Sequence, residues 1–331
     1  MSAPTHMRPR LRPWRFGGAP VGIGASWFAG LLFAGLLFAG LLFAGLLFAG
    51  CLAAGWLPAA AAAPLRIVAA ERVYADVARQ IAGSAATVTA VLNNPATDPH
   101  LFEAAPSVAR ALANARIVVA NGAGYDPWMD ALLRANPVPD RQVLVIARLL
   151  GVRAGSNPHL WYDPAAMPAY ADALARILSA ALPAEAPDFA RRLARFRASL
   201  RPIDAHIATL RARFAGTAVT ATEPVFGRMA DTLGLRMRNR RFQRAVMNGS
   251  EPGPAEVAAF ERDLRTRAVR VLIYNRQATT PATRRLLDIA RRAGVPVLGV
   301  TETEPAGLSY QAWIGGTLDA LEAALTAPPH P

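Results

Sequence analysis

Short apolar runs alternate with helix-like stretches along most of the chain, and this alternation limits the possible fold more than any other feature. Runs such as Ile117–Ala120 are apolar throughout rather than at every second residue, which is typical of parallel strands covered on both faces. Strands are predicted at 65–70, 87–92, 117–120 and 142–146, and in a second series at 217–221, 269–274 and 296–300. We therefore expect an α/β fold of two lobes, each with a mainly parallel sheet flanked by helices.

The segment between the two series predicts one long helix. Between residues 184 and 214, Phe189, Leu193 and Phe196 recur at helical spacing in an otherwise polar stretch. We expect this helix to join the lobes. The predicted organisation is a targeting segment at 1–63, a first lobe at 64–183, a linker helix at 184–214 and a second lobe at 215–328.

The N-terminal segment has the pattern of a secretory signal. Four arginines within residues 8–15 precede an apolar run over 21–57, and small residues follow. We expect Sec-type export with cleavage close to Ala62 or Ala63. Because the run is long and contains Cys51, an uncleaved anchor and a lipidated Cys51 stay open as alternatives. All three place the folded part in the periplasm or otherwise outside the cytoplasm.

The basic character of the chain does not indicate nucleic-acid binding. The formal net charge is +13, yet every basic residue is an arginine and no basic stripe is interleaved with aromatic residues. Most arginines lie in helix-like stretches, where a solvent-facing position is expected. The single cysteine is Cys51, so the rest of the chain can hold neither a disulfide nor a thiolate metal site.

Two histidines occur in matching contexts, Asp98-Pro-His-Leu-Phe102 and Asn157-Pro-His-Leu-Trp161. In both segments a proline restricts the backbone just before the histidine. An apolar residue and an aromatic residue follow, and we expect Phe102 and Trp161 to shield the imidazoles from water. His6, His206 and His330 have no such context and are not predicted ligands.

Two carboxylates follow strands of the second series. Glu223 and Glu302 follow the predicted strands 217–221 and 296–300, each after one intervening threonine. Ligands of open α/β sheets bind beyond the carboxyl ends of the strands, and His100 and His159 fit loops at the matching edge of the first lobe. We therefore predict one metal site, formed by two imidazoles and two carboxylates. Glu103 or Asp163 is expected to hold the second nitrogen of an imidazole.

Four motifs in this order resemble the zinc/manganese solute-binding proteins of ABC-type importers. They are Thr97-Asp-Pro-His-Leu-Phe-Glu103, 121–129, 157–164 and the closing 300–313. The resemblance extends from about residue 65 to 326. It implies a TroA-like fold, no enzymatic activity, and metal ligands at His100, His159, Glu223 and Glu302. Glu304 competes with Glu302 for the last position.

The resemblance also implies the cargo and the partners. The cargo would be one divalent metal ion, Zn²⁺ or Mn²⁺, with Fe²⁺ as a further candidate, and the partner would be the importer's membrane permease. We expect a monomer. An adhesin-like surface role is a further alternative, which would coexist with metal capture. Two departures matter: residues 149–156 are short and neither histidine-rich nor acidic, and the third ligand is a glutamate. The glutamate in place of a histidine favours Mn²⁺ or Fe²⁺, whereas zinc binds more tightly to most sites. The sequence therefore favours neither zinc nor manganese as the cargo.

Two other functions remain as alternatives. A zinc hydrolase also uses histidine and glutamate ligands, but its metal keeps a position open for water. A siderophore- or corrinoid-binding protein of the same fold would hold its cargo through arginines and aromatic residues.

Overall fold

The computed structural model describes residues 35, 38–41, 64–94, 102 and 104–328. The predicted ligand His100, the candidate partner Glu103 and the candidate lipidation site Cys51 lie outside the described residues. The described residues from 64 to 328 belong to one compact unit. Within the described part of the chain, no helix combines the length and the apolar character that a bilayer crossing requires.

The first sheet contains four parallel strands in the order β2-β1-β3-β4. The strands are β1 (Leu65–Glu71), β2 (Ala86–Leu92), β3 (Ile117–Ala120) and β4 (Gln142–Val145). Alternate residues of β3 supply different cores, because Ile117 and Val119 pack on one face and Val118 and Ala120 on the other. Burial on both faces explains why this strand is apolar throughout.

The second sheet repeats the arrangement, with four parallel strands in the order β6-β5-β7-β8. The strands are β5 (Ala218–Ala221), β6 (Arg236–Arg238), β7 (Leu272–Asn275) and β8 (Val297–Val300). The predicted class, two parallel α/β sheets flanked by helices, is confirmed. The edge strand β6, of which only Met237 is buried, was not predicted from the sequence.

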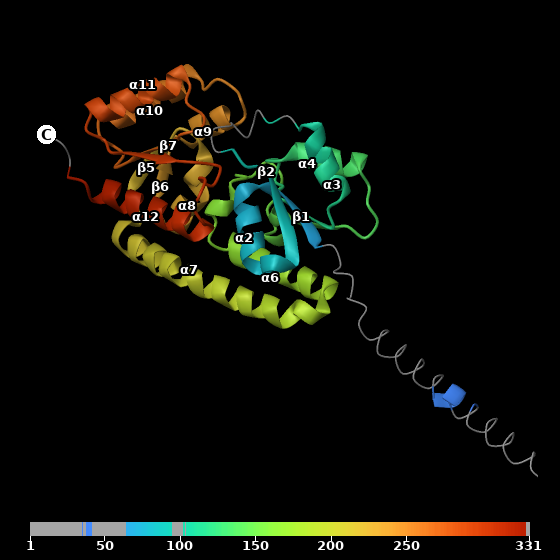
Figure 1. Cartoon of the computed structure of the whole chain (residues 1–331). Helices are drawn as coiled ribbons and strands as arrows, with labels where there is room; N and C mark the ends of the chain where they lie inside the picture. The colour runs from blue at the N-terminus through green and yellow to red at the C-terminus, as the bar shows by residue number, and fades with distance from the viewer. Residues whose placement is uncertain (1–34, 36–37, 42–63, 95–101, 103, 329–331) are drawn as a thin grey trace, which may run out of the picture. The chain divides into compact units, whose positions relative to one another are not determined.

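Helices cover both sheets (Figure 1). Those of the first series are α2 (Arg72–Ala82), α3 (Pro106–Ala113), α4 (Pro127–Ala135), α5 (Ile146–Leu149) and α6 (Ala166–Ala181). Those of the second are α8 (Gly227–Thr232), α9 (Arg240–Met247), α10 (Pro254–Arg265), α11 (Pro281–Arg292) and α12 (Tyr310–Thr326). Four of them begin with proline, whose fixed φ suits the first helical position.

The long helix α7 (Ala186–Phe214) follows the first lobe and precedes the second. It contacts α2 and α6 of the first lobe and α12 of the second, and Figure 1 shows it running beneath both. One apolar stripe is buried, comprising Phe189, Phe196, Leu200, Ile203, Ile207 and Leu210. The predicted long linker helix is therefore present, while the exact domain boundaries stay predictions.

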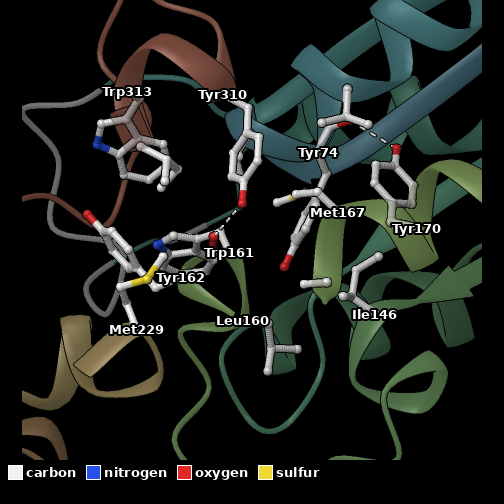
Figure 2. Packing of buried hydrophobic residues seen from close by; sticks show 14 of the residues in the cluster. Tyr74, Ile146, Leu160, Trp161, Tyr162, Met167, Tyr170, Met229, Tyr310 and Trp313 are labelled. Atoms are coloured by element: carbon white, nitrogen blue, oxygen red, sulfur yellow. Dashed lines mark hydrogen bonds between the residues drawn. The ribbon is translucent and has the colours of Figure 1, made fainter. Parts of the chain in front are cut away.

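Aromatic side chains join the lobes through a shared core (Figure 2). Tyr162 of the first lobe packs edge-on against Phe226 and Trp313 of the second, with ring centroids 5.2 and 5.4 Å apart. The Tyr310 hydroxyl of α12 donates to the Trp161 carbonyl at 3.3 Å. Edge-to-face aromatic pairs stabilise beyond the area that they bury, so these contacts stabilise the packing of one lobe against the other.

Candidate metal centre

Two glutamates of the second lobe are held side by side by one amide. Asn275 ends β7, which lies between β5 and β8 in the sheet, and Glu223 and Glu302 follow those neighbouring strands. The Asn275 Nδ2 donates to Glu223 Oε2 at 2.7 Å and to Glu302 Oε1 at 2.6 Å. Both carboxylates are buried.

Gln277 fixes the direction of that amide and the position of the loop after β8. Its backbone N–H donates to Asn275 Oδ1 at 3.0 Å, which leaves the Asn275 NH₂ group directed at the glutamates. The Gln277 Oε1 accepts the backbone N–H groups of Glu302 and Thr303 at 2.6 and 3.0 Å. The acidic pair is therefore held in place from within its own lobe.

His159 enters the centre from the first lobe and is only 1% exposed. Its Nδ1 lies 2.7 Å from Asn157 Oδ1, which also accepts the His159 backbone N–H at 3.1 Å. The Asn157 Nδ2 donates to the Pro224 carbonyl of the second lobe at 2.7 Å, so the oxygen of this amide must face the ring. Nδ1 is therefore the protonated nitrogen, and in the neutral ring Nε2 carries a lone pair.

The Nε2 atom of His159 has no hydrogen-bond partner among the described residues. It lies 3.4 Å from Glu302 Oε2. A buried polar atom without a partner is costly in a folded protein. A donor pair at this separation can bind one metal ion, because imidazole and carboxylate ligands each lie about 2 Å from zinc.

Tyr125 adds a second contact between the lobes. Its hydroxyl donates to Glu302 Oε2 at 2.9 Å, and its ring packs edge-on against the rings of His159 and Trp161. Burial, followed by the nearby Glu302 charge, raises the pKa of Tyr125 well above its usual value. The tyrosine therefore stays a hydroxyl donor at neutral pH.

Aromatic residues enclose the imidazole, as predicted for Trp161. This side chain is fully buried and its ring centroid lies 5.5 Å from that of His159, with the planes perpendicular. Phe102 is partly buried and packs against Trp128 with centroids 4.7 Å apart. Water is thus kept from the His159 ring on the side of Trp161.

The structure separates the two competing glutamates of the closing motif. Glu302 contacts His159, whereas the Glu304 carboxylate lies 3.9 Å from the Arg72 Nε of α2. Burial, followed by the negative charge of Asp76, raises the pKa of Glu304 to about 8. This arrangement favours Glu302 as the ligand.

Three of the four predicted ligands are described, and the structure brings them together to different degrees. His159 and Glu302 are in contact, and Glu223 is linked to Glu302 through Asn275. Within residues 64–94, 102 and 104–328, no three histidine, cysteine or acidic residues are grouped closely enough to hold an ion by themselves. His100, the fourth predicted ligand, stays a prediction.

Three residues that contact the predicted ligands were given no role from the sequence: Asn275, Tyr125 and Asn157. The proposal of Asp163 as the partner of an imidazole is wrong for His159, because Asn157 takes that role and Asp163 instead lies 3.3 Å from Arg228. The signal for Asn157 was present, since an Asx side chain readily bonds to backbone two residues on. The signal for Asn275 was its place at a strand end.

A further buried carboxyl group, that of Asp126, lies in the turn that follows β3 of the first sheet. Asp126 accepts the backbone N–H groups of Asn121 and Gly122 at 2.7 and 2.8 Å. Burial raises its pKa from 3.8 to about 6 despite these hydrogen bonds. Gly122 permits this turn because its φ is +76° and a Cβ there would lie 2.6 Å from a Val145 methyl carbon.

Solved structures with the same fold bind metal ions. The periplasmic zinc-binding protein TroA of Treponema pallidum matches with a TM-score of 0.69 and 18% identity, over 80% of this chain and all of that one. FpvC of Pseudomonas aeruginosa, solved with Mn²⁺, matches with a TM-score of 0.65 and 21% identity, over 80% and 98%. At these identities the matches establish the fold.

Two curated relatives match over shorter stretches. A putative metal-binding protein of Thermotoga maritima is 35% identical over 94 residues, which are 28% of this chain and 32% of the relative. The manganese-binding lipoprotein MntA of Halalkalibacterium halodurans is 29% identical over 102 residues, or 30% and 34%. The aligned part thus spans about a third of each relative.

The family model described as "zinc-uptake complex component A periplasmic" matches residues 67–324, nearly the whole described part. Members of this family are metal-binding transport proteins and not enzymes, which confirms the expectation that the chain has no catalytic function. With the fold, the His159–Glu302 contact and this match together, the chain belongs to the ZnuA family of periplasmic zinc-uptake components.

Proposed function

We propose that this protein captures one divalent transition metal ion outside the cytoplasm and delivers it to an ABC-type importer. The ligands would be His100, His159, Glu223 and Glu302. The observation that carries the proposal is the buried Nε2 of His159, which has no hydrogen-bond partner among the described residues and lies 3.4 Å from Glu302 Oε2. A metal ion would give that lone pair a partner.

The residues around these donor atoms orient them in a way that favours metal binding. Asn157 fixes the tautomer that presents Nε2, and Asn275 engages one oxygen of each glutamate. Outer groups of this kind orient ligands and raise metal affinity. Affinity should fall in acid, because protons compete for the imidazole and the carboxylates.

Two imidazoles and two carboxylates form a donor set for zinc or manganese. Nitrogen and oxygen donors suit zinc, whose intrinsic affinity is higher. A second carboxylate in place of a third imidazole makes the site harder and favours manganese, with iron as a further candidate. Relatives include proteins described as zinc-binding and as manganese-binding, so competition between the two ions must decide.

Export and delivery complete the proposed role. The family description is periplasmic, and the basic and apolar N-terminal segment would direct export, with lipidation of Cys51 or a retained helix as a tether. A membrane permease would receive the ion from a monomeric protein. No part of this role requires catalysis.

Metal titration tests the proposal. Metal-free protein should take up one equivalent of Zn²⁺ or Mn²⁺ in calorimetry, and protein incubated with equal concentrations of both ions should show one dominant metal by native mass spectrometry. Saturable binding of one ion supports the proposal. A tightly held siderophore or corrinoid without a metal ion at His159 would overturn it, as would a stoichiometry of zero.

A further inference from the structure

A cavity of about 600 Å³ lies beside the candidate metal centre and is lined by both lobes. The first lobe contributes the loop 151–157, and the second lobe contributes residues of α8 and α9. The volume falls within the range of small-molecule sites, about 300–1,000 Å³. His159, Glu223 and Glu302 do not line it, so this cavity is distinct from the metal centre.

Positive charge predominates on the wall of this cavity. Four arginines face a single acidic residue, Asp231, whose carboxylate is 2.7 Å from Arg240 Nη2. The side chains of Arg153 and Arg244 make no hydrogen bond or ion pair with any residue that the structure describes. Unbalanced positive charge within a bounded volume raises the local concentration of anions.

The fourth arginine, Arg228, is held in a fixed position. Its Nε and Nη2 donate to the Asn157 carbonyl at 2.9 and 2.6 Å, and its Nη1 lies 3.3 Å from Asp163 Oδ2. A guanidinium has five N–H groups, so N–H groups remain for a ligand. A positioned donor loses little conformational entropy on binding.

We propose that this cavity binds a small anion that carries two or more carboxylate or phosphate groups. Arginine pairs with both kinds of group through the same bidentate geometry. Arg153 lies on the first lobe, whereas Arg240 and Arg244 lie on α9 of the second. An anion with several charged groups can therefore engage arginines of both lobes, which an anion with one charged group cannot do as well.

The cavity is coupled to the metal centre through Asn157. Its backbone carbonyl accepts from Arg228 at the cavity wall, while its side-chain oxygen holds the His159 ring. An anion that bridges the lobes stabilises the arrangement in which these contacts exist. Slower metal release in the presence of the anion follows from this coupling and rests on the proposed function, whereas anion binding itself does not.

Anion binding to the metal-free full-length protein tests the proposal. The probes are tricarballylate, which has three carboxylates without the chelating hydroxyl of citrate, inorganic pyrophosphate, and acetate as the anion with one charged group. We expect saturable heat in calorimetry for tricarballylate, pyrophosphate or both, and none for acetate; the tighter of the two identifies the preferred group. Failure of both to saturate at millimolar concentration would overturn the proposal.

Paired variants locate the site. The double variant Arg153→Gln/Arg244→Gln should weaken binding of the tighter anion by about tenfold or more, because each arginine contributes charge-assisted hydrogen bonds. Arg195→Gln/Arg201→Gln, with the same loss of charge on exposed positions of α7, should bind like the parent. An equal loss in both double variants would mean general charge attraction and would overturn the assignment.

Zinc titration of the same proteins without anion separates the two proposals. Both double variants should bind zinc as tightly as the parent. Protein that binds zinc but neither anion refutes the cavity proposal alone. Protein that binds an anion but no metal refutes the proposed function alone.

Discussion

The Nε2 of His159 lies 3.4 Å from the Oε2 of Glu302, and these two residues come from opposite lobes. The histidine is presented by a loop that Asn157 stabilises, and the glutamate follows a strand of the second sheet. Both side chains are almost fully buried in the folded chain. Changes at either residue should alter metal binding more than folding.

Removing the imidazole tests the ligand assignment. His159→Ala should lower metal affinity by roughly a hundredfold or more, since loss of an outer group alone costs about 10–100-fold. Calorimetry with Zn²⁺ and Mn²⁺ measures the change, and thermal unfolding without metal should confirm a folded protein. His206→Ala serves as the control, because His206 pairs with Glu322 on the helical surface; equal affinity of the His159 variant and this control would refute the assignment.

Asn275→Ala tests whether the acidic pair depends on its shared amide. Loss of both hydrogen bonds leaves two adjacent buried carboxylates to repel each other, so we expect metal affinity to fall about 10–100-fold. The stability of the metal-free protein should fall as well, and metal should restore part of it. Asn248→Ala is the matched control, since Asn248 is exposed and its side chain lies outside the site; a parental affinity for Asn275→Ala would contradict the role given to this amide.

Gly227→Ala tests the contact that orients His159. A Cβ at Gly227 would lie 2.8 Å from Asn157 Nδ2, closer than nonbonded atoms approach, so the Asn157 side chain must shift, and we expect its contact with the imidazole to weaken. We expect metal affinity to fall about tenfold through this outer group. Gly316→Ala, where nothing lies within 4 Å of the added carbon, should bind metal normally and gain helix stability; matching affinities for the two variants would show that Asn157 does not orient His159.

The pKa of Asp126 predicts a pH dependence of stability. The carboxyl titrates at about 6 in the folded chain against 3.8 without the fold, so the folded state binds its proton more tightly. The contribution of protonated Asp126 to the free energy of unfolding is fully present below pH 3.8 and is lost as pH rises through about 6. The total loss amounts to about 3 kcal/mol. Urea unfolding of metal-free protein at pH 4 and 7 measures it.

Asp126→Asn isolates that contribution from those of other acids. The variant should lack the loss of stability between pH 4 and 7 that Asp126 causes in the parent. Asp204→Asn, which removes an exposed carboxyl group on α7, should retain it. Identical pH profiles for the parent and Asp126→Asn would show that burial does not raise this pKa.

The strands were predictable where burial on both faces required apolar residues. The residues of β3 are all apolar, and its predicted limits, Ile117 and Ala120, are those observed. The edge strand β6 reads Arg-Met-Arg and carries no such pattern, because a strand with one neighbour needs less burial. Its existence depends on pairing with β5, which local sequence does not encode.

Residues of the candidate site were predictable from the sequence where the side chain itself can bind a metal ion. His159 and Glu302 were identified from motif and strand position, and they are in contact. Asn275 was not identified because an uncharged amide gains its role only from two neighbours that other strands supply. Hydrogen bonds between distant elements are a property of the folded chain, so these supporting residues emerge only from the structure.

The amide that joins Glu223 to Glu302 belongs to the same lobe as both acids. If the lobes part during delivery, the ion would lose its imidazole from the first lobe while the acidic pair stays assembled. The second lobe would then keep two of the four predicted ligands in position for the next ion. The metal-loaded and metal-free states would then differ mainly in the position of the first lobe, which carries His159.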